Sequence, residues 1–190
     1  MTAAMHLPRF LVRQRITLGV NRYDVHAANP DGSAGALMAF AQQKRFAFKE
    51  QVTFWSDDSR SRAVFSFRAR QRLDVRAEHD VLDEHGRVIG TFGKRFGASL
   101  LRSTWTLTAP GVAATGRERS LGVALLRRVA ENLPLPYHFD VTEDSGGSLL
   151  MSSDRRWSLR DSYDVSVPDP RIDFRLAAAF AVALDALQDR

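Results

Sequence analysis

The sequence predicts a mainly β domain that closes into a barrel around its own C-terminal helix. Two observations predict this architecture. Through the first 110 residues, apolar and polar side chains alternate with a period of two, which is the pattern of β-strands. Near the C-terminus, alanines surround one bulky helical stripe, formed by Ile172, Leu176, Phe180, Leu184 and Leu187. A helix that is apolar on all sides is buried on all sides, and a thin one that follows many strands fits inside a sheet closed around it.

Composition indicates one domain over residues 1–190, with 44% apolar and 26% charged residues. The chain has no cysteine, which excludes disulfides, thiolate metal sites and cysteine catalysis and fits a reducing compartment. Arginines interrupt the N-terminal segment, so it lacks a signal-peptide pattern. The most apolar run, Leu176–Leu184, is far shorter than the roughly 20 residues of a membrane span. We therefore expect a cytoplasmic protein without a transmembrane segment.

The segment Arg60–Arg76 has the clearest strand pattern. Its basic residues occupy even positions: Arg60, Arg62, Arg68, Arg70, Arg72 and Arg76. Its apolar residues mostly occupy odd positions: Ala63, Phe65, Phe67, Ala69, Leu73 and Val75. Because successive strand side chains point to opposite faces, one face of this segment is predicted to be a row of guanidinium groups. Val64 and Asp74 interrupt the alternation and indicate a bend or a change of strand.

Turn residues divide the strands into hairpins, and Asn29–Ser33 and Asp83–Gly86 are the strongest turn signals. A weak repeat accompanies the hairpins. Tyr23-Asp-Val25, His79-Asp-Val81 and Phe139-Asp-Val141 each precede a glycine-containing turn, and a basic pair with an aromatic residue follows each turn: Lys44-Arg-Phe46, Lys94-Arg-Phe96 and Arg155-Arg-Trp157. We interpret this as a repeated supersecondary unit; the alternative is chance recurrence of hairpin chemistry.

Three segments depart from the β pattern. Residues 44–51 are compatible with one or two helical turns. Residues 110–136 read as an insertion that contains a short helix near 119–132, with Ser120 as its N-cap. For the C-terminal helix, Asp169 is the predicted N-cap and Pro170 the first helical residue.

Residues Phe10 to Leu107 resemble the LURP-one-related proteins, small members of the tubby C-terminal-like superfamily, which also includes the phospholipid scramblases. The features that carry the resemblance are Phe10-Leu-Val-Arg-Gln-Arg15, Tyr23-Asp-Val25, Lys44-Arg-Phe-Ala-Phe-Lys49, His79-Asp-Val-Leu-Asp-Glu-His-Gly86 with Val88-Ile-Gly90, and the helix Phe174–Leu187. Residues 108–136 are not accounted for. The resemblance implies a single domain over residues 1–190, folded as an antiparallel barrel of about 12 strands around a central hydrophobic helix.

Catalytic motifs are absent from the sequence. The histidines lack zinc-ligand spacing, and there is neither a Gly-x-Ser-x-Gly elbow nor a phosphate-binding Gly-rich loop. The carboxylates Asp80, Asp83 and Glu84 lack the spacing of a calcium loop and are better explained as a solvated hairpin. We therefore expect no enzyme activity, no metal and no cofactor.

The charge distribution supplies the functional hypothesis. The net charge is +5, and residues 1–128 carry 21 basic and 11 acidic residues, a net +10. Tubby domains bind phosphoinositides, so the resemblance implies anionic lipid binding here, which we assign to Arg68, Arg70 and Arg72 with the neighbouring Lys44, Arg45 and Lys49. The partner is then an anionic membrane surface bound peripherally. Nothing resembles the palmitoylation tract or calcium segment of the scramblases.

Three alternatives to lipid binding stay open. The arginine row is also explained as an ordinary solvated strand face. Nucleic-acid binding, a less favoured alternative, would use Trp55, Trp105 and Trp157 for base stacking beside basic residues. A purely structural or protein-docking module is the third. The sequence does not define the oligomeric state.

Overall fold

The computed structural model describes residues 5–17, 20–44, 51–70, 78–95, 104–119, 138–156 and 162–188. Within these ranges the chain forms twelve strands and then one helix, α2 (Phe174–Gln188). The strands are β1 (Arg9–Thr17), β2 (Val20–Ala28), β3 (Ala34–Lys44), β4 (Gln51–Trp55), β5 (Ala63–Ala69), β6 (Glu78–Asp83), β7 (Val88–Arg95), β8 (Thr104–Ala109), β9 (Val112–Glu118), β10 (His138–Glu143), β11 (Leu149–Arg156) and β12 (Ser162–Ser166).

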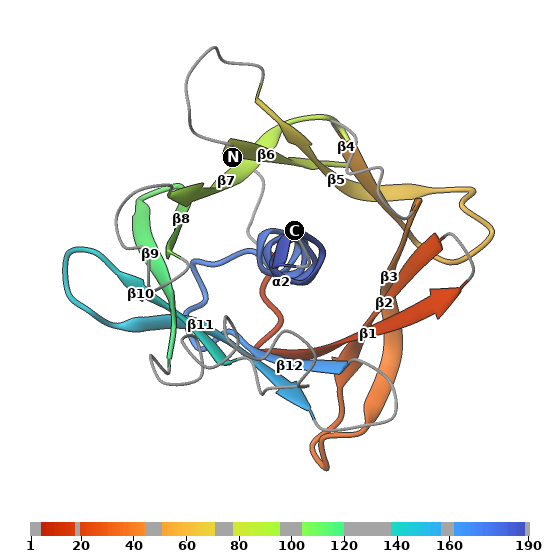
Figure 1. The fold of residues 1–190 in the computed structure, drawn as a ribbon, viewed down its shortest axis with the longest axis horizontal. Helices are drawn as coiled ribbons and strands as arrows, with labels where there is room; N and C mark the ends of the chain where they lie inside the picture. The colour runs from red at the N-terminus through yellow and green to blue at the C-terminus, as the bar shows by residue number, and fades with distance from the viewer. Residues whose placement is uncertain are drawn as a thin grey trace.

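The strands form a closed barrel. Each strand pairs antiparallel with its neighbours in sequence, and β12 pairs with β1 to complete the ring. Figure 1 shows this ring with α2 at its centre. The predicted closed antiparallel barrel around a C-terminal helix is therefore confirmed.

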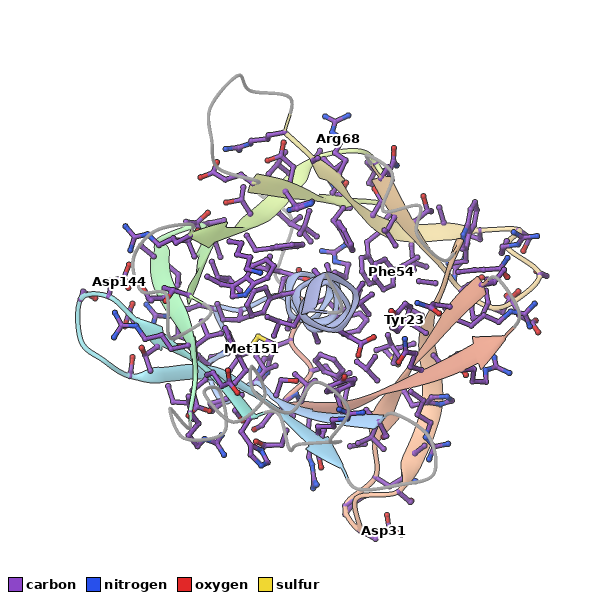
Figure 2. The ribbon with its side chains drawn as sticks, in the orientation of Figure 1. Tyr23, Asp31, Phe54, Arg68, Asp144 and Met151 are labelled. Atoms are coloured by element: carbon purple, nitrogen blue, oxygen red, sulfur yellow. The ribbon has the colours of Figure 1, made fainter. Side chains whose placement is uncertain are left out.

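The period-two pattern of the strands separates the barrel interior from its outer wall. On β2, Tyr23 and Val25 are fully buried, and on β5 Phe65 and Phe67 are 1% exposed. Arg68, the next residue, is exposed. Figure 2 shows Tyr23 and Phe54 pointing from the wall toward α2, whereas Arg68 lies outside the wall. Strand alternation therefore places an aromatic lining inside and charged side chains outside.

Helix α2 fills the interior. Every residue from 172 to 185 is buried. The Phe180 ring lies 5.6 Å from Phe92, 5.8 Å from Trp105 and 5.8 Å from Phe139, measured between ring centroids. Six alanines separate the bulky side chains of the helix, so its backbone approaches the wall closely at those positions. Burying one such phenylalanine side chain stabilises the fold by about 1.5–3 kcal/mol. The buried helix therefore contributes a large part of the stability of the core.

The predicted N-cap of α2 was wrong by four residues. The helix begins at Phe174, and its N-cap is Asp173, whose carboxylate accepts hydrogen bonds from the backbone N–H of Arg175 at 2.9 Å and of Met5 at 3.0 Å. Asp169 instead closes a turn by accepting from the Arg171 N–H at 2.9 Å. The chain uses this turn to pass from β12, on the wall, to the centre of the barrel before the helix begins.

The predicted insertion over residues 110–136 was wrong in its first part. Residues 112–118 form β9, which pairs with both β8 and β10. Val112, Ala114 and Glu118 are buried on the inner side of this strand. Gly111, with φ of 71°, provides the left-handed turn between β8 and β9. After Val112 the inner residues are small or charged, so the strand lacks the bulky apolar alternation that would have identified it.

The remaining predicted features fall only partly on residues that the structure describes. The turns at 29–33 and 83–86 join β2 to β3 and β6 to β7, as expected. In the arginine row, Arg60 and Arg62 lie in the loop before β5 rather than on it. The helix predicted near 119–132 and the helical turns predicted at 44–51 fall almost entirely outside the described residues, as do Arg72 and Arg76.

A substitution at Gly90 tests how closely α2 approaches the wall. A Cβ at this β7 position would lie 2.6 Å from Leu176 Cδ2 and 2.7 Å from the Thr108 carbonyl oxygen. Because the carbonyl belongs to the neighbouring strand, it cannot move aside, so G90A should destabilise the fold by about 1–3 kcal/mol. G146A is the matched control, since its Cβ would meet nothing nearer than 4.0 Å. Equal chemical-denaturation midpoints for the two variants would contradict this packing.

Candidate functional site

The carboxylates of Asp80, Asp83 and Glu84 form hydrogen bonds or ion pairs within the fold. Among the residues that the structure describes, no cluster of histidines and carboxylates has metal-binding geometry. Asp83 accepts hydrogen bonds from the backbone N–H groups of His85 and Arg87, both at 2.9 Å, and from Arg87 Nε at 2.8 Å. These contacts close the β6–β7 turn, as the hairpin interpretation predicted. Asp80 and Asp83 are buried, however, so the prediction that these carboxylates are solvated was wrong for both.

A polar cluster lies inside the barrel at the C-terminal end of α2. Asp185 is 8% exposed and accepts hydrogen bonds from the hydroxyls of Tyr23, at 2.9 Å, and Tyr163. Gln14 Nε2 donates to the Tyr23 hydroxyl at 3.4 Å. Burial, followed by the nearby Asp185 carboxylate, raises the pKa of Tyr23 well above its usual range. Tyr23 therefore stays a neutral donor, and the cluster fixes the helix to β2 and β12.

Of the six basic residues assigned from the sequence, Arg68 has the surroundings that best suit ligand binding. It lies on the outer face of β5, is exposed, and makes no ion pair with any residue in the described ranges. Gln51 of β4 pairs with Arg68, and Lys44 ends β3, the other neighbour of β4. The backbone positions of Lys44 and Arg68 are thus two strands apart at one end of the barrel, roughly 10 Å from each other.

Arg70, by contrast, is engaged within the fold. Its Nε lies 2.6 Å from Asp80 Oδ1, and its Nη1 lies 3.3 Å from Glu78 Oε2. Arg72, Arg45 and Lys49 fall outside the described residues. Of the six basic residues assigned from the sequence, the structure therefore places Arg68 and the backbone of Lys44 together, with Arg70 beside them in an ion-paired state.

The ion pair of Arg70 has counterparts on two other parts of the wall. Arg15 of β1 pairs with Asp24 of β2 at 2.8 Å, and Arg119, just after β9, pairs with Asp140 of β10 at 2.5 Å. The three aspartates are the central residues of the repeated Tyr23-Asp-Val25, His79-Asp-Val81 and Phe139-Asp-Val141 motifs. The hydrogen bonds that Arg119 donates to Asp140, more than any other contact, hold the pKa of Arg119 above its usual range.

Sequence reasoning missed basic residues that match Arg68. Arg13 and Arg117 are exposed, face outward and lie two residues before Arg15 and Arg119. The sequence does contain a signal for them, because an Arg-x-Arg step precedes each Asp-Val pair. Its spacing to the aspartate varies, so only the strand pairing reveals the equivalence.

The nucleic-acid alternative loses part of its basis. Trp105, one of the three tryptophans proposed for base stacking, is fully buried and contacts Phe180 of α2. Trp55 is half-buried, and Trp157 lies outside the described residues. Trp105 is therefore a core residue and has no face available to a base.

The helices bear on membrane insertion. In the described part of the chain, none has both the length and the hydropathy required to cross a bilayer.

The chain is similar to one known protein family and to one solved structure. The model of the LURP-one-related family matches residues 37–185, well over half of the chain. Among solved structures, the X-ray structure of a protein from Arabidopsis thaliana is similar, with 14% sequence identity and a TM-score of 0.49, covering 97% of this chain and 94% of that one. No curated protein matches significantly.

The Asp185 cluster generates a stability prediction. D185A leaves two buried hydroxyls without their acceptor, which should lower the free energy of unfolding by about 1–3 kcal/mol for each hydroxyl. D185N keeps one acceptor oxygen and should cost less. Urea unfolding of both variants checks this order, and a D185A variant as stable as the wild type would show that the cluster does not hold the helix.

Tyr23 should make the free energy of unfolding depend on pH. Above its usual pKa of 10.0, Tyr23 loses its proton in the unfolded chain but keeps it in the fold, because burial raises its folded pKa. Its contribution to stability is therefore complete below about pH 10 and declines as the pH rises further. The free energy of unfolding should fall more steeply between about pH 9 and pH 11 in the wild type than in Y23F. Parallel curves for the two proteins would contradict this assignment.

Proposed function

We propose that this chain, which belongs to the LURP-one-related family, is a non-enzymatic barrel module that binds anionic phospholipid headgroups, phosphoinositides among them. Binding uses the basic outer wall around Arg68, with Lys44, Arg45, Lys49, Arg70 and Arg72 as the neighbouring cations. The protein acts in the cytoplasm as a single domain over residues 1–190 and associates with the membrane peripherally.

The barrel interior supports an external ligand site. Helix α2 and the aromatic lining occupy the lumen, with every residue from 172 to 185 buried. The surfaces accessible to a ligand are then the outer wall and the two ends of the barrel. A headgroup phosphate can approach an arginine there without displacing any part of the core.

The observation that carries the proposal is the state of Arg68. Its guanidinium is exposed and has no carboxylate partner in the described residues, so it can form a bidentate contact with phosphate. The strand register places the end of β3, with Lys44, at the same end of the barrel. Near an anionic bilayer each such cation contributes about 1 kcal/mol.

A pair of single variants tests the proposal by vesicle co-sedimentation. R68Q should weaken binding to phosphatidylserine-containing vesicles about fivefold, because it removes an unpaired charge. R70Q removes the same formal charge, but Glu78 and Asp80 already neutralise Arg70. R70Q should therefore weaken binding less than R68Q.

The same experiment separates the alternatives. Binding that does not depend on anionic lipid would remove the proposed function. Equal losses in R68Q and R70Q would show that net charge, and not the Arg68 position, controls association. Salt-dependent retention of single-stranded DNA, without retention on vesicles, would support the nucleic-acid alternative instead.

A further inference from the structure

An arginine pattern recurs on every fourth strand of the barrel. Arg13-Gln-Arg15 lies on β1, Arg68-Ala-Arg70 at the end of β5, and Arg117-Glu-Arg119 at the end of β9. In each case the strand that follows carries an outward aspartate. The three aspartates are Asp24, Asp80 and Asp140, on β2, β6 and β10. The outer wall thus repeats one charge arrangement in three units of four strands.

Within each unit the two arginines differ. The second arginine forms the ion pair, with N–O distances of 2.8 Å for Arg15, 2.6 Å for Arg70 and 2.5 Å for Arg119. The first arginine lies directly opposite the aspartate in the register. Arg13, Arg68 and Arg117 are nevertheless exposed and make no ion pair within the described residues. The fold therefore neutralises one arginine of each pair and leaves the other available.

A second set of basic residues marks the same end of the barrel. Strands β3, β7 and β11 end on Lys44, Arg95 and Arg156 respectively. Because all odd-numbered strands run in one direction, these three positions lie in the half of the barrel where the odd strands finish. Arg68 and Arg117 are each next to last in their strands, and Arg13, the middle residue of β1, pairs with Ser162 at the start of β12, which begins in the same half. We call this half the basic end.

The opposite end carries carboxylates in its turns, including Asp31, Asp57, Asp58, Glu84, Asp144 and Asp169. We call it the acidic end. Several arginines there are bound to carboxylates: Arg87 to Asp83 at 2.8 Å, Arg171 to Glu143 at 2.8 Å, and Arg175 to Asp173 at 2.8 Å. Arg60 and Arg62 are exposed in the β4–β5 loop at this end, but the carboxylates named above outnumber them in its turns.

We propose that the basic end is the surface that docks on an anionic bilayer, with Arg13, Arg68 and Arg117 as three equivalent headgroup contacts. This inference rests on the proposed function and specifies its geometry. Strands β1, β5 and β9 lie at well-separated points around the ring (Figure 1). A flat surface reaches all three only when the barrel stands on its end, whereas a barrel lying on its side presents one of them. The acidic end then faces away from the like-charged bilayer.

Two double variants test this geometry. R13Q/R117Q removes two available arginines on strands far from Arg68 and should weaken binding to phosphatidylserine vesicles roughly 25-fold, about fivefold for each charge. R60Q/R62Q removes two exposed arginines from the β4–β5 loop at the acidic end and should leave binding nearly unchanged. Thermal unfolding of both variants verifies that the fold is retained.

The outcomes separate this inference from the proposed function. If the wild type binds and R68Q weakens binding while R13Q/R117Q does not, the end-on geometry is wrong and lipid binding around Arg68 stands. Equal losses in the two double variants would also overturn the end-on geometry. A wild type that ignores anionic lipid removes the proposed function, and the inference with it.

The absence of cysteine allows a direct measurement of orientation. Gln51 is exposed at the basic end, opposite Arg68, and Ala113 is exposed at the acidic end. An environment-sensitive fluorophore attached to Q51C should shift to shorter wavelength on phosphatidylserine vesicles, whereas the same label on A113C should not. A response at A113C, or equal responses at both positions, would contradict the proposed orientation.

Discussion

The burial of α2 is the constraint on which the rest of the structure depends. A helix without a polar face cannot lie against a sheet that leaves one side in water, so the sheet has to surround it. Alanine at six of its fifteen positions keeps the helix thin, and Phe180 reaches Phe92, Trp105 and Phe139 on three separate strands. Because side chains fill the lumen in this way, a contact with another molecule has to be made on the outer wall or at the two ends of the barrel.

Polar contacts at both ends of α2 give this apolar helix one position. At its start, Asp173 holds the N-terminal segment through Met5 and the first turn through Arg175. At its end, Asp185 holds Tyr23 and Tyr163 on the wall. Apolar packing alone would tolerate a helix shifted along the barrel, whereas buried hydrogen bonds are satisfied in a single register. We infer that these contacts specify position more than they add stability.

The sequence predicted the barrel because α2 and the long, alternating strands β1, β2 and β5 each carry a strong local signal. It did not predict β9, whose inner side combines Ala114, Gly116 and Glu118 in place of large apolar residues. It assigned Arg68 and Arg70 the same role, because ion pairing with Asp80 depends on strand register and not on spacing along the chain. The equivalence of Arg13 and Arg117 with Arg68 was hidden for the same reason, since residues 120–137 separate Arg119 from β10.

The central claim is that α2 stays inside the wall, both in solution and on a membrane. Hydrogen–deuterium exchange of the amides between Ala177 and Asp185 tests it most directly, because these groups reach solvent only when the barrel opens. We expect these amides to exchange at the rate of global unfolding, with the same protection in the presence of phosphatidylserine vesicles. Rapid exchange in solution, or a change confined to α2 when vesicles are added, would place the helix outside the barrel and contradict the account.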